Sequence, residues 1–102
     1  MGITKDLPTD QWQDRFQSLT SGNKQRMTSI ITKEGKVVEG APFVRILFDP
    51  VGKGDRLFVT LENFSHVIEH PVEIYITKKS NGQLSSLEIT DENGDSTFVN
   101  FE

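Results

Sequence analysis

Near the amino terminus, apolar residues recur with the spacing of one face of a helix. They lie at positions i, i+4 and i+7 with polar residues between them: Trp12, Phe16 and Leu19. This spacing predicts a helix over about 9–21 whose apolar stripe packs on the rest of the protein. Thr9 is expected at its N-cap and Gly22 at its C-terminal cap.

Beyond the helix, apolar and polar residues alternate with a period of two, which is typical of β-strands. The alternation predicts strands at 27–33, 36–40, 43–49, 56–62, 72–79, 84–90 and 95–101. Every connection except 63–71 is too short for a parallel crossover, which needs about a dozen residues. The strands should therefore form an antiparallel meander over about 26–101.

Length and element order together predict one α+β domain over 1–102. We expect one N-terminal helix packed on a strongly curled antiparallel meander sheet of six to seven strands. The sheet could also close into a partly open barrel, and the sequence does not decide between these two forms.

The alternation also assigns side chains to the two faces of the sheet. In 56–62 the odd-numbered residues are apolar and should face the core, which leaves Phe58 on the outer face. In 72–79 the even-numbered residues, Val72 among them, should face the core, with Tyr75 outside. Phe58 and Tyr75 are therefore candidates for an interaction surface, because a large ring facing only water would be unusual.

Composition excludes several kinds of chemistry. The chain has no cysteine, so disulfides, thiolate zinc sites and a cysteine nucleophile are ruled out. Eleven basic residues against fifteen acidic ones give a net charge of −4, which opposes general binding to nucleic acid. No apolar stretch approaches the roughly 20 residues that span a bilayer, and we expect a cytoplasmic protein without membrane contact.

The string "HVIEH" at 66–70 matches a metalloprotease pattern, H-x-x-E-H. On a helix both histidines would share one face, but in a strand they would lie about 13 Å apart, too far to share one ion. Pro71 disfavours helical geometry at His70, and the neighbouring residues alternate like strands. We therefore expect no metal here, but a short connection or edge strand with Ile68 packed inward. His66 alone is kept as a candidate ligand contact.

Two further patterns are interpreted as turns. Residues 91–102 resemble a calcium-binding loop, but Ser96 occupies the position that needs glycine, and Asn93-Gly94 is a hairpin signal. "PVGKGD" at 50–55 joins two predicted strands and opens no helix that could hold a phosphate. Without a nucleophile elbow or a dinucleotide motif, no catalytic residue and no cofactor are assigned.

Several loose motifs together resemble a small bacterial family known only as a domain of unknown function. They are W-x-x-x-F at 12–16, "PFVRILFDP" at 42–50, His-x-Ile-x-x-Pro at 66–71, and a final hairpin with Leu87, Ile89, Gly94 and Phe101. His66 and Pro71 match this pattern, whereas His70 does not. The resemblance implies no activity, cofactor or site residue. At the level of fold alone, a helix followed by a curled sheet is also similar to Sm-like barrels.

The leading hypothesis is a non-catalytic protein-binding or self-associating module, because an open sheet has free edges that can accept a strand. One alternative is a small-ligand or enzymatic role at 63–71, the longest predicted loop, around His66. A second alternative, an Sm-like barrel binding nucleic acid, is disfavoured by the acidic charge.

Overall fold

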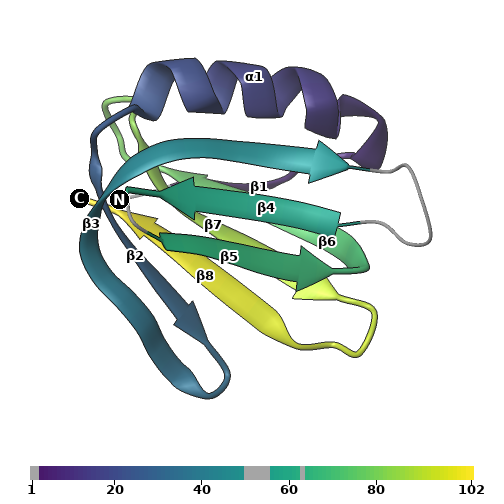
Figure 1. Ribbon diagram of the computed structural model, residues 1–102. Coiled ribbons are helices and arrows are strands. Elements are labelled where there is room, and N and C mark those ends of the chain that lie inside the picture. Colours follow the sequence, from purple (N-terminus) through teal and green to yellow (C-terminus); the bar gives the residue numbers. More distant parts are fainter. Residues whose placement is uncertain (1–2, 50–55, 63) are drawn as a thin grey trace.

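The computed structural model describes residues 3–49, 56–62 and 64–102, and the predicted turn at 50–55 lies outside this part. The elements are β1 (Ile3–Asp6), the 3-10 turn η1 (Thr9–Gln11), α1 (Trp12–Asn23), β2 (Met27–Thr32), β3 (Gly35–Asp49), β4 (Arg56–Leu61), β5 (Phe64–Glu69), β6 (Pro71–Lys78), β7 (Leu84–Asp91) and β8 (Ser96–Phe101). The predicted α+β class is confirmed, because one helix packs on one antiparallel sheet (Figure 1). No helix of the described residues is long and apolar enough to cross a membrane.

The sheet has eight strands rather than the six to seven predicted. Their order is β1-β6-β7-β8-β2-β3-β4-β5, so the prediction of a single meander was wrong. Two meanders, β2 to β5 and β6 to β8, are joined by pairing of β2 with β8. Strand β1 adds to β6, a partner that follows it by about 70 residues in the sequence. Within the described residues β1 and β5 pair with only one strand each, so the sheet stays open and is not a closed barrel.

Strand β3 combines two segments that the sequence predicted as separate strands. Its first half, 35–42, pairs with β2, and its second half, 43–49, pairs with β4. A bulge in the pairing with β2 falls at Gly40, whose φ of +66° is the left-handed conformation that glycine adopts without strain. The long strand therefore bends and carries the chain from one half of the sheet to the other, as the curve of β3 in Figure 1 shows.

A second bulge corrects the predicted faces of β6. Ile74 and Ile76 are buried as expected, but Val72 is 48% exposed. The register shifts between Pro71 and Glu73, so that Val72 is an extra residue without a partner on β7. An extra residue in a strand shifts the inward–outward alternation of side chains at that point, and Val72 therefore points outward.

Helix α1 lies over the carboxy-terminal half of β3 (Figure 1). Trp12 is only 1% exposed, and its ring meets Phe48 of β3 edge to face with centroids 4.9 Å apart. Its indole N–H donates to the carbonyl of Leu7 at 2.9 Å, which ties the helix to the segment after β1. The predicted apolar stripe is therefore the contact between helix and sheet.

The ends of the helix differ from the prediction. The segment from Thr9 is a 3-10 turn, and the α-helix begins at Trp12 with Gln11 at its N-cap. Gly22 lies inside the helix, which continues to Asn23. There the Asn23 side-chain amide donates to the carbonyl of Leu19 at 2.8 Å, so a side chain satisfies a helix-end carbonyl without a glycine cap.

Thr20 links the helix to the open edge of β3. Its hydroxyl accepts from the backbone N–H of Ile46 at 3.2 Å and donates to the carbonyl of the same residue at 3.3 Å. In this half β3 pairs with β4 on one side only, so the hydroxyl occupies the place where another strand would bond. The hydroxyl thereby satisfies backbone groups that would otherwise lie unpaired beneath the helix.

Replacing Thr20 by valine should lower the free energy of unfolding by about 1–2 kcal/mol, because both backbone groups of Ile46 lose their partner. Valine keeps the β-branched shape and helix propensity of threonine. Ser21→Ala is the matched control, since that hydroxyl donates only within the helix, to the carbonyl of Gln17. Urea unfolding of both variants gives the comparison, and equal losses would contradict a specific role for Thr20.

Candidate functional site

Strand β5 forms the free edge of one half of the sheet. Within the described residues it pairs with β4 alone. Of the two expectations for 63–71, a loop or an edge strand, the structure has the edge strand over Phe64–Glu69. Ile68 is 5% exposed, so it packs inward as predicted. His66 lies within the extended strand, so the helical geometry that H-x-x-E-H requires is absent.

His70 is the single residue that connects strand β5 to strand β6, at one corner of the sheet. Strand β5 ends at Glu69 and β6 begins at Pro71, so His70 alone turns the chain. Its φ is +53°, an uncommon value for a residue other than glycine. Its carbonyl accepts from the backbone N–H of Glu92 at 3.0 Å, which fixes the corner to the turn between β7 and β8.

An open groove of about 440 Å³ lies beside β5, and we call it the acidic groove. Its walls are β5 with His70, the turn between β2 and β3, and the turn between β7 and β8. Five carboxylates and one lysine line it: Glu34, Glu69, Asp91, Glu92, Asp95 and Lys33. The lysine pairs with Asp95 at 2.8 Å, and this hydrogen-bonded carboxylate raises the pKa of Lys33. The groove therefore has an excess of negative charge.

His66 lines this groove from the inner face of β5. Its ring stacks on that of Phe64 with centroids 6.4 Å apart and an interplanar angle of 10°. Partial burial lowers the pKa of the His66 imidazole below its ordinary value of 6.5. No group of three or more histidine, aspartate or glutamate side chains in the described chain is arranged to hold a metal ion.

The calcium-like pattern forms the hairpin turn that the sequence predicted. One carboxylate oxygen of Asp91 accepts from the backbone N–H groups of Asn93 and Asp95, at 2.9 and 3.1 Å. Gly94 has a φ of +84°, as this turn requires. The Asp91 carboxylate is thus occupied in holding the turn that forms one wall of the acidic groove.

The outer face of β3, β4 and β5 presents an apolar row that ends at the free edge. Cross-strand pairing places Leu47 opposite Phe58, and Phe58 opposite Val67. Leu47 is 49% and Val67 42% exposed, and the Phe58 ring lies half-buried between them. Phe58 therefore has the outward placement that the alternation predicted, and two neighbours extend it to β5.

Tyr75 lies on β6, in the other half of the sheet, and the structure does not bring it together with Phe58. Its register partners are Asp6 and Glu88. The negative charge of Glu73, together with a hydrogen bond to that carboxylate, raises the pKa of the Tyr75 hydroxyl. These polar surroundings differ from the apolar row around Phe58.

Sequence reasoning missed most of this site because its parts come from distant segments. The signals for Leu47 and Val67 were present in the period of two, but their alignment with Phe58 depends on the register of three strands. The acidic groove depends on contact between β5 and two turns that lie some 30 residues away on either side. Neither relation is encoded by local spacing.

The fold and site define a small α+β domain with an open antiparallel sheet, one free edge of which borders an acidic groove and an apolar row. The chain belongs to a family of unknown function, DUF5335, whose family model matches residues 3–102. It is also similar to an uncharacterized protein of Aquifex aeolicus (strain VF5), with 29% identity over 97 residues that cover 89% of this chain and 85% of the relative. These matches confirm the resemblance seen in the sequence. No solved structure matches significantly.

His66 should make the stability of the protein depend on pH near neutrality. Because burial lowers its pKa in the folded state, the unfolded chain takes up the proton first as the pH falls through 6.5. The free energy of unfolding should therefore decrease from about pH 7 to about pH 5, and His66→Asn should remove part of that decrease. Urea unfolding at each pH measures the effect, and NMR titration of the His66 ring checks its cause. A folded-state pKa at or above 6.5 would contradict it.

Proposed function

We propose that the protein is a non-catalytic protein-binding module that accepts an extended strand of a partner at the free edge of β5. The observation that carries this proposal is the position of that edge, which borders both the acidic groove and the apolar row, with Val67 belonging to both. The partner strand would carry basic side chains on one face and apolar side chains on the other.

The backbone of β5 supplies the part of the affinity that does not depend on the side chains of the partner. An edge strand has a row of N–H and C=O groups without a strand to pair with, and an extended peptide can satisfy them by continuing the sheet. Strand β5 is six residues long, and its pairing with β4 runs from Phe64 to Glu69 without a register shift. It therefore offers an uninterrupted template for pairing.

The acidic groove selects the inward side chains of the added strand. Alternate side chains of a strand point to opposite faces, so every second residue of the partner would face the groove. Two of the five carboxylates are paired, Asp95 with Lys33 and Glu69 with Arg56. The remaining negative charge attracts lysine or arginine at these positions and repels acidic residues. Since the groove is open to solvent, this attraction should weaken with salt.

The apolar row selects the outward side chains. A residue placed beside Val67 would continue the row that begins at Leu47 and Phe58. Cross-strand apolar pairs stabilise a sheet by roughly 0.2–1 kcal/mol each. Valine, isoleucine or an aromatic residue in the partner would fit here.

A second copy of the chain fits this edge less well than a different protein. The inward residues of β5 itself are Phe64, His66 and Ile68, which include no permanent cation. Pairing β5 with β5 of another copy would also place two acidic grooves close together. Charge complementarity therefore favours a basic partner, and self-association is a separate outcome of the experiment below.

A small-ligand role at 63–71 is the second candidate, favoured by the half-buried His66 ring at the groove. The acidic lining would select a small organic cation. A cytoplasmic location accompanies either role as part of the proposal, because the core is stabilised without disulfides.

A synthetic peptide that alternates lysine and valine should bind and shift the amide resonances of β5 in a saturable way. The double variant Glu34→Gln/Glu92→Gln should weaken binding about fivefold through lost attraction. Val67→Lys should weaken it about tenfold, because it interrupts the apolar row and adds a like charge. NMR titration and calorimetry provide the affinities.

Matched controls separate these effects from changes in overall charge. Asp10→Asn/Asp14→Asn removes the same charge at the helix, and Val72→Lys replaces another valine that is 48% exposed. Both should bind like the parent protein. Equal binding of an alternating glutamate–valine peptide would contradict the proposal. Equal binding of lysine amide alone would indicate a small ligand, and concentration-dependent dimers abolished by Val67→Lys would indicate a second copy.

A further inference from the structure

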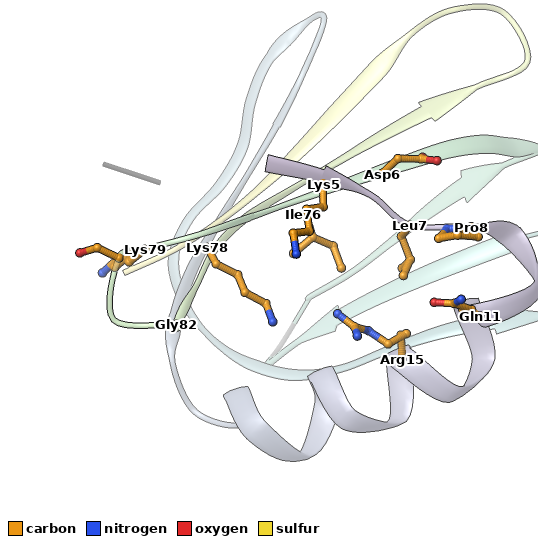
Figure 2. A pocket seen from close by; sticks show the side chains of 11 residues that line it. Lys5, Asp6, Leu7, Pro8, Gln11, Arg15, Ile76, Lys78, Lys79 and Gly82 are labelled. Carbon is orange, nitrogen blue, oxygen red and sulfur yellow. The ribbon is translucent and has the colours of Figure 1, made fainter. Parts of the chain in front are cut away.

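A hollow of about 360 Å³ lies on the helix side of the molecule, and we call it the basic pocket. It is enclosed by three segments: the end of β1 with the residues after it, the start of the helix, and the end of β6 with the turn to β7. Figure 2 shows side chains from all three segments around the same space. It shares no lining residue with the acidic groove.

Cations gather in this pocket although the chain as a whole is acidic. Four of its eleven basic residues line the pocket, against one carboxylate, Asp6: they are Lys5, Arg15, Lys78 and Lys79. In the described part of the chain none of the four forms an ion pair, whereas Lys33, Lys36 and Arg56 each do. Like charges held close together repel one another, and a bound anion would remove that repulsion.

The charged ends of three side chains are directed to one place. In Figure 2 the ends of Lys5, Lys78 and Arg15 turn toward the centre of the hollow, whereas the Asp6 carboxylate points away from it. Arginine presents a planar fork of donors that matches a phosphate or carboxylate group. The arrangement is therefore suited to one compact anionic group.

The floor of the pocket is apolar and fixed. Leu7 and Ile76 are each 4% exposed, and Pro8 lies beside them. Pairing of Lys5 with Ile76 holds β1 against β6, and the N–H of Leu7 donates to the carbonyl of Ile74 at 2.8 Å. A ligand with an apolar portion could thus pack on a preformed surface while its anionic group meets the cations.

A neighbouring hollow of about 430 Å³ extends the same positive region along the helix. It shares Arg15 and Lys78 with the basic pocket, adds Arg26, and has no acidic residue among its described lining. Arg26 is committed to the fold, because its guanidinium donates to the carbonyls of Leu84 and Glu102 at 2.8 and 2.9 Å. Arg15 and Lys78 are therefore the cations that both hollows offer to a ligand.

We infer that the basic pocket binds a small organic anion, with a phosphate or carboxylate group held by Arg15, Lys5 and Lys78 and an apolar portion on Leu7 and Ile76. This site is independent of strand addition at β5. A volume of about 360 Å³ accommodates a metabolite-sized molecule rather than a polymer.

Phenyl phosphate is a suitable probe, because it combines a phosphate with an apolar ring. It should shift the amide resonances of Leu7, Ile76 and Lys79 in a saturable way, with a Kd of about 1 mM or tighter. Arg15→Gln and Lys78→Gln should each weaken binding about tenfold through loss of a charge-assisted hydrogen bond. Inorganic phosphate, which lacks the ring, and phenol, which lacks the charge, should both bind more weakly.

Lys24→Gln is the matched control, since Lys24 is an exposed cation at the far end of the same helix and lines neither hollow. Its affinity for phenyl phosphate should equal that of the parent protein, and unchanged thermal unfolding of all three variants shows that they fold. Equal weakening by Lys24→Gln would overturn the inference by reducing it to overall charge. Absence of saturable shifts in the parent protein would overturn it as well, and inorganic phosphate binding as tightly as phenyl phosphate would refute the organic class.

Discussion

The structure depends on one constraint, the exchange of partners along strand β3. Because β3 pairs with β2 over its first half and with β4 over its second, the sheet bends at Gly40 and its two halves come to enclose the core. The exchange leaves the edge of the second half without a strand. Helix α1 covers that edge, with Trp12 packed on Phe48 and the Thr20 hydroxyl bonded to Ile46. The helix is thus needed to cover the unpaired edge of the sheet. Its narrow apolar stripe is enough for this contact, because the sheet supplies most of the core.

A bent open sheet has two open sides, and this protein treats them differently. The helix covers one side and leaves the basic pocket between itself and β1 and β6. On the other side no described element covers the edge of β5, and the acidic groove lies there. Charged side chains cannot enter the core without partners, so they collect at these openings. Packing does not require positive side chains to gather at one opening and negative side chains at the other. This separation of charge is therefore the feature on which the two proposed ligands, one anionic and one cationic, depend.

The sequence was sufficient for whatever depends on local spacing. Periodicity and turn residues were enough to predict the apolar stripe of the helix, the turn at Asn93-Gly94 and the strands from β2 to β8 apart from β5, with β3 predicted in two pieces. It was insufficient where distant segments decide. Strand β1 is only four residues long and exists because β6 offers it an edge. The bulge at Val72 reverses a face that strict alternation predicted to be inward. For the candidate site, the outward placement of Phe58 was predictable, but its neighbours and the acidic groove required the register and the bend.

His66 couples the proposed strand binding to pH in a definite direction. Its ring lies at the acidic groove, where partial burial already favours the neutral form. An added basic strand would bring positive charge toward the imidazole and remove more water from it, and both effects favour the neutral form further. By linkage, protonation of His66 must then weaken binding of the strand by the same free energy. A histidine at this position therefore does not need to bind metal or perform chemistry to affect the proposed strand binding, because its protonation would weaken the attraction of the free edge of β5 for a cationic partner.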